Sequence, residues 1–109
     1  MTEPKDPNEA VEYLLKTAPR FAKAKSERVY IENFLRSKKS ILMAQVEGSN
    51  PTKEAYAYAH PEYIELLEGL RTAVEAEETL KWKMTAAELV VEIWRSQEAS
   101  NRMQDRATR

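Results

Sequence analysis

The sequence contains no cysteine and only two glycines among its 109 residues. Without cysteine the chain can form neither a disulfide nor a thiolate metal site. Two glycines are far below the usual share of about 7%, and β-rich folds use glycine in their many tight turns. The composition therefore disfavours sheets, while its richness in Ala, Glu, Lys, Leu and Arg favours helices.

Long apolar runs are also missing. No stretch approaches the ~18 consecutive apolar residues of a membrane-spanning helix, and the N-terminal MTEPKDPNEA lacks the apolar core of a signal peptide. Neither sign of charge dominates, because the net charge is −1 although 32% of the residues are charged. We therefore expect one soluble domain of the cytoplasm that is neither a basic nucleic-acid coat nor an acidic mimic of one.

Residues suited to catalysis are scarce. The chain has one histidine, His60, and its two aspartates, Asp6 and Asp105, lie near the ends. A Ser-His-Asp arrangement would have to use these distant acids. One histidine cannot supply the two Glu-x-x-His pairs of a di-iron bundle or the several ligands of a zinc enzyme.

A carboxylate site for magnesium is the remaining catalytic alternative. Glu62, Glu65 and Glu68 are at helical spacing, as are Glu75 and Glu78. Since no aspartate joins them, we interpret these glutamates as a solvated helix face. The sequence therefore predicts a protein that is not an enzyme and has no catalytic residue, metal ligand or cofactor.

Helix start and stop signals predict three or four helices in one domain. After a flexible N-terminus over 1–6, Asp6-Pro7-Asn8-Glu9 is typical of a capping box, and a short helix is expected over 7–17. Pro19 should end that helix, because proline lacks a donor and restricts the residue before it. A second helix is expected over 19–47, with Gly48 as its stop.

A turn region over 48–60 follows, and its residues 52–59 could form one or two helical turns. From Pro61 only Gly69 interrupts the helical pattern, so a single helix is expected over 61–103, before a flexible tail over 104–109. That helix would be roughly 60 Å long. The expected fold is all-α: an elongated antiparallel hairpin with a short N-terminal helix, a very long C-terminal helix and coiled-coil-like packing.

The long helix carries a heptad seam. With Tyr63 at position a, the apolar and aromatic residues of the a and d positions are Tyr63, Leu66, Leu70, Ala73, Leu80, Met84, Ala87, Val91 and Trp94. This spacing predicts left-handed supercoiling against a partner helix. Glu77 and Glu98 also fall in the seam, so each should meet a basic partner or water. We expect Trp94 to be buried.

A second apolar stripe lies beside this seam. Its members are Leu67, Val74, Leu89, Val90 and Ile93. One partner helix does not cover both stripes. Packing within the chain could cover them, but the length of the helix favours a homo-oligomer, a dimer or a tetramer.

Charge is divided between the two long segments. Residues 16–47 hold eight Lys or Arg and three Glu, whereas residues 53–98 hold five Lys or Arg and ten Glu. Pairing of a basic helix with an acidic one explains the division. The alternative is a nucleic-acid contact through Arg36, Lys38 and Lys39, extended by Arg20, Lys23 and Lys25. We favour the pairing.

The stretch AYAYAHPEYIELL at 55–67 places His60 among three tyrosines. Pro61 disfavours helical geometry at His60 and suits the first position of a helix. We interpret the stretch as the start of the long helix, with Tyr56, Tyr58 and Tyr63 closing the end of the hairpin. A ligand site around His60 is the alternative.

Two segments, AHPEYIELLEGLR at 59–71 and IWRSQEASNR at 93–102, resemble small uncharacterised helical proteins encoded by tailed bacteriophages and prophages. The resemblance implies a phage-encoded protein in the cytoplasm of a bacterium and transfers no catalytic residue. We expect a non-catalytic, self-associating helical interaction protein that offers a surface to a protein partner. The alternative is a nucleic-acid-binding accessory protein of phage DNA metabolism, which would use the basic second helix.

Overall fold

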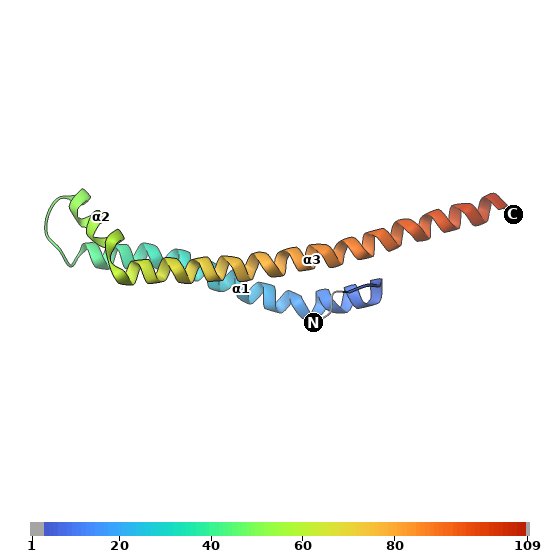
Figure 1. The fold of residues 1–109 in the computed structure, drawn as a ribbon, viewed down its shortest axis with the longest axis horizontal. Helices are drawn as coiled ribbons and strands as arrows, with labels where there is room; N and C mark the ends of the chain where they lie inside the picture. The colour runs from blue at the N-terminus through green and yellow to red at the C-terminus, as the bar shows by residue number, and fades with distance from the viewer. Residues whose placement is uncertain (1–3, 109) are drawn as a thin grey trace. The chain divides into compact units, whose positions relative to one another are not determined.

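The computed structural model describes residues 4–108, and these form three α-helices (Figure 1). Helix α1 spans Pro7–Met43, α2 spans Asn50–Ala59 and α3 spans Pro61–Thr108. No strand occurs within residues 4–108. The all-α fold predicted from the sequence, a helical hairpin with a long C-terminal helix, is confirmed.

Helix α1 begins where the capping box predicts. The Asp6 carboxylate accepts a hydrogen bond from the Glu9 backbone N–H at 2.9 Å, and the Glu9 carboxylate accepts one from the Lys5 N–H at 3.1 Å. Two donors at the helix start are therefore satisfied by side chains. Pro7 occupies the first helical position, where its missing N–H harms nothing.

The expected break at Pro19 is wrong. Helix α1 continues through Pro19, so the short helix over 7–17 and the helix over 19–47 are parts of one helix of 37 residues. Pro19 is exposed, and the carbonyl that loses its helical donor belongs to Leu15, which is also exposed. Water can satisfy that carbonyl, and packing of the opposite face of α1 offsets the cost of the proline.

The buried face of α1 explains this tolerance. Buried and half-buried residues recur there at heptad spacing: Leu14, Phe21, Arg28, Leu35 and Leu42 at one position, and Ala10, Thr17, Ala24, Ile31 and Lys38 at the other. In this heptad Pro19 falls at the outermost position, away from the packed face.

The connection between the long helices contains a helix over the residues 52–59 that were expected to form helical turns, but the helix is longer than expected. Helix α1 ends at Met43 rather than at 47, and helix α2 fills most of the connection. Gly48 has φ 137°, a conformation that favours glycine. Ser49 then caps α2, since its side chain accepts a hydrogen bond from the Thr52 N–H.

Helix α3 begins at Pro61, as predicted, but runs beyond the expected end at 103 to Thr108. Most of the stretch expected to be a flexible tail, residues 104–108, is therefore helical. Of the N-terminal stretch 1–6, residues 1–3 lie outside the described part of the chain, as does Arg109. Residues 4–6 are not helical.

The chain divides into two compact units. In unit 2, residues 22–78, the buried side chains are Ala24, Leu35, Leu42, Ala57, Ala73 and Glu77. In unit 1, residues 1–21 with 79–109, they are Ala10, Thr17 and Ala87 among the described residues. Most of these buried residues are alanines. Their small side chains allow the backbones of packed helices to approach closely.

The described helices also lack the long apolar runs that the sequence lacks. Within residues 4–108, no helix offers an apolar window long enough to cross a membrane.

Candidate functional site

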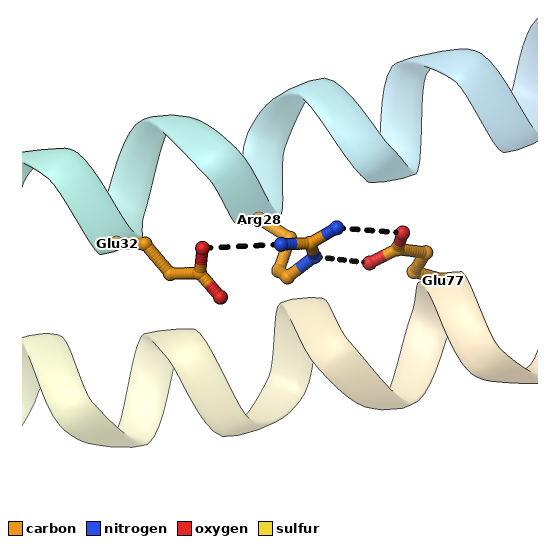
Figure 2. Close-up of polar contacts among 3 residues, drawn as sticks. All are labelled: Arg28, Glu32 and Glu77. Atoms are coloured by element: carbon orange, nitrogen blue, oxygen red, sulfur yellow. Dashed lines mark hydrogen bonds and ion pairs between the residues drawn. The ribbon is translucent and has the colours of Figure 1, made fainter.

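Unit 2 contains an ion pair between Arg28 of α1 and Glu77 of α3, shown in Figure 2. Arg28 donates through Nε and Nη2 to the two carboxylate oxygens of Glu77, and the Nη2 to Oε1 distance is 3.0 Å. The Nη1 atom donates to Glu32, one turn along α1, at 3.1 Å. Arg28 therefore binds Glu77 in the bidentate geometry that arginine favours, and Glu32 accepts one further hydrogen bond.

This pair lies inside the packed face. Glu77 is buried, and the Arg28 side chain is mostly covered. Hydrogen bonds to Glu77, and then to Glu32, raise the pKa of the Arg28 guanidinium above its ordinary value. The prediction that Glu77 meets a basic partner is confirmed. A charged pair inside the packed face favours one register of the two helices over others.

Sequence reasoning did not identify Arg28. It occupies a heptad position of α1 between Phe21 and Leu35, where an apolar residue is usual. Arg28 is a charged residue in an apolar heptad position of α1, and Glu77 is one in an apolar heptad position of α3. This shared feature is the sequence signal that could have predicted their pairing.

Two of the three candidate nucleic-acid residues of α1 contact acidic residues. Lys38 forms an ion pair with Glu62 of α3, and Lys39 lies 3.4 Å from Glu54 of α2. Both lysine side chains are more than two thirds covered. Arg36 is exposed. These contacts favour the pairing of basic and acidic segments over a phosphate-binding surface at Lys38 and Lys39.

Two electrostatic effects follow from these pairs. The Lys38 ammonium lowers the pKa of the Glu62 carboxyl. The Tyr58 hydroxyl, and after it Glu54, raises the pKa of the Lys39 ammonium. The Lys39 Nζ atom also lies 4.9 Å from the centroid of the Tyr58 ring, within the range of a cation–π contact.

His60 joins α2 to α3 and has an extended backbone, with φ −68° and ψ 133°. Its Nδ1 atom accepts a hydrogen bond from the Glu62 backbone N–H at 3.1 Å, so the imidazole caps α3. The ring packs edge-on against Tyr56, and Tyr58 packs edge-on against Tyr63. The interpretation of this stretch as the start of the long helix is confirmed, whereas the closing of the hairpin end by the tyrosines stays a prediction.

The predicted seam residues of α3 differ in exposure. Tyr63, Leu66 and Leu70 of unit 2 are half-buried, as are Leu80, Met84 and Val91 of unit 1. Trp94 is not buried within the single chain, where it is 48% exposed. Glu98 is exposed to water. Whether these residues form an oligomer seam stays a prediction.

The second stripe is largely uncovered. Leu67 and Val74 of unit 2 are exposed, and so are Leu89 and Ile93 of unit 1, whereas Val90 is half-buried. Beyond Val91, every described residue of α3 is exposed, over 92–108. This last part of α3 therefore has no packed face within the described chain.

No group of three or more His, Asp or Glu within residues 4–108 is arranged to hold a metal ion. Comparison with family models, with curated proteins and with solved structures finds no match for this chain.

Proposed function

We propose that the protein is a non-catalytic helical interaction protein that associates with copies of itself through α3 and offers a surface to a protein partner. The observation that carries the proposal is the uncovered last part of α3. A helical segment gains most of its stability from packing of an apolar face, yet residues 92–108 have no packed face in the single chain.

Large exposed apolar side chains support self-association. Within unit 1 they are Val11, Leu15, Trp82, Leu89, Ile93, Trp94 and Met103. Soluble monomers rarely expose extensive apolar patches, and such patches are typical of surfaces that bind protein. A dimer or a tetramer would remove them from water.

The resemblance of residues 59–71 and 93–102 to helical proteins of tailed bacteriophages supports the rest of the proposal. On this account the protein is encoded by a phage or prophage and acts in the cytoplasm of the bacterial host. A nucleic-acid role has less support, because Lys38 and Lys39 are engaged by Glu62 and Glu54.

Multi-angle light scattering over a concentration series tests self-association. We expect a molar mass of at least twice the 12.6 kDa of the chain at micromolar concentrations. A 12.6 kDa species that persists at several hundred micromolar would refute the proposal.

A further inference from the structure

The exposed face of α3 in unit 1 has a heptad pattern of its own. Positions that alternate by four and three residues from Trp82 onward carry Trp82, Ala86, Leu89, Ile93, Ser96, Ser100, Met103 and Ala107. We call this set the outer seam. None of its members is charged, and all of them are exposed in the single chain.

The outer seam lies opposite the packed face of α3. Leu89 is two residues from Ala87 and from Val91, which places it about 200° around the helix axis from each of them. Ala87 is buried and Val91 half-buried, whereas Leu89 is 56% exposed. A partner could therefore bind the outer seam without displacing the residues that already pack on α3.

We infer that the outer seam binds the outer seam of a second copy of this chain, with the two α3 helices antiparallel. The inference rests on the proposed self-association and names the surface and its geometry. The overlap would extend along roughly 40 Å of helix.

Side-chain size supports the antiparallel arrangement. When the two seams overlap fully, Trp82 faces Ala107 of the second copy, and Ala86 faces Met103. In the same register Leu89 faces Ser100 and Ile93 faces Ser96. Each layer pairs a large side chain with a small one, as well-packed interfaces require. A parallel pair would instead stack Trp82 on Trp82 and Ser100 on Ser100.

Charge along one flank of the outer seam supports the same orientation. Glu88 and Glu92 occupy its first half, and Arg95, Arg102 and Arg106 its second half. Antiparallel pairing places Glu88 of each copy level with Arg102 of the other, while the two Arg95 side chains meet near the midpoint of the overlap. Parallel pairing would place like charges together, which is unfavourable. The opposite flank has one charged residue, Lys83, among Val90, Trp94, Gln97, Asn101 and Gln104.

Disulfide trapping tests the geometry. Because the chain has no native cysteine, only the introduced thiols can form disulfides. Two single variants, Ala86→Cys and Met103→Cys, are mixed in a glutathione buffer, and the masses of the disulfide-linked products are measured by intact mass spectrometry. We expect the mixed disulfide between residues 86 and 103 to dominate. Each variant alone should link poorly, because its two thiols would lie about 25 Å apart.

Ser26→Cys, at an exposed site of α1 outside the seam, gives the background level of random linkage. Dimers linked through 86 and 86 or through 103 and 103 would overturn the antiparallel arrangement. Mixed linkage no greater than the Ser26→Cys background would overturn the outer seam as the interface. In either case light scattering of the unmodified protein decides the proposed self-association separately.

A charge exchange supplies a second, independent test. Glu88→Arg and Arg102→Glu should each weaken the dimer, roughly five- to tenfold in dissociation constant at low salt, because two symmetric pairs are lost. The double variant Glu88→Arg/Arg102→Glu should restore the affinity of the original protein to within about twofold. Sedimentation equilibrium measures these affinities. If the double variant associates no more tightly than either single variant, the inferred register is overturned.

Discussion

Arg28 and Glu77 join α1 to α3 through two parallel hydrogen bonds between a guanidinium and a carboxylate. Removal of either partner takes the two parallel hydrogen bonds away from a covered charge, so Arg28→Leu and Glu77→Leu should each destabilise the fold more than Glu32→Leu does. The double variant Arg28→Leu/Glu77→Leu should recover most of the loss, because an apolar pair fits the seam.

Urea denaturation of the three Arg28 and Glu77 variants, analysed as a double-mutant cycle, measures this coupling. Additive losses in the double variant would show that the two residues act independently. Glu32→Leu serves as the matched control, since Glu32 contacts the same guanidinium from an exposed position.

Acid should weaken the contact between Lys38 and Glu62. Lys38 lowers the pKa of Glu62, so the stabilisation is present above the ordinary glutamate pKa of 4.5 and is lost as the pH falls through the lower pKa of the folded state. Carboxyl chemical shifts followed by NMR from pH 7 to about pH 2 report this pKa directly. In Lys38→Met the Glu62 pKa should rise towards its ordinary value, and an unchanged titration would contradict the ion pair.

The imidazole cap at the start of α3 predicts a specific order of stabilities. His60→Ala should lose about 1 kcal/mol, because the Glu62 N–H loses its acceptor, whereas His60→Asn should be nearly neutral, since asparagine caps well. Pro61→Ala should cost less than about 1 kcal/mol. Thermal melts of the three variants check the order. His60→Asn as the least stable of them would show that the ring makes a further essential contact.

The two glycines should respond oppositely to alanine. A Cβ at Gly69 meets nothing within 4 Å, so Gly69→Ala should stabilise helix α3 by about 1 kcal/mol. Gly48→Ala should destabilise by roughly 1–2 kcal/mol, because φ is 137° and the new Cβ would lie 3.3 Å from the Thr52 side chain. Denaturant midpoints of both variants provide the measurement, and stabilisation by Gly48→Ala would contradict the turn geometry.

Much of the fold could be predicted because its signals are local. The capping box at Asp6 and the start of α3 at Pro61 depend on neighbouring residues alone, and both are confirmed. The partner of Glu77 could be predicted only as basic, since Arg28 is distant in the sequence and its role depends on the register of two helices.

The errors share a physical cause. Pro19 is normally a helix breaker, but it lies on the outer face of a helix whose other face is packed, and packing overrides the local preference. The packed face of α1 was hard to recognise because it includes Ala10, Thr17 and Ala24, which a search for large apolar residues overlooks. The outer seam went unrecognised for the same reason, since half of it is alanine or serine.

Amide hydrogen exchange of residues 92–108, measured at several protein concentrations, tests the central claim most directly. If a second copy covers this part of α3, its amides should exchange rapidly at low concentration and become protected as the concentration rises, while amides around Leu42 stay protected throughout. Ile93→Glu, on the outer seam, should abolish the concentration dependence, and Ile64→Glu, exposed but outside the seam, should preserve it. Exchange over 92–108 that is equally fast at all concentrations would contradict association through α3.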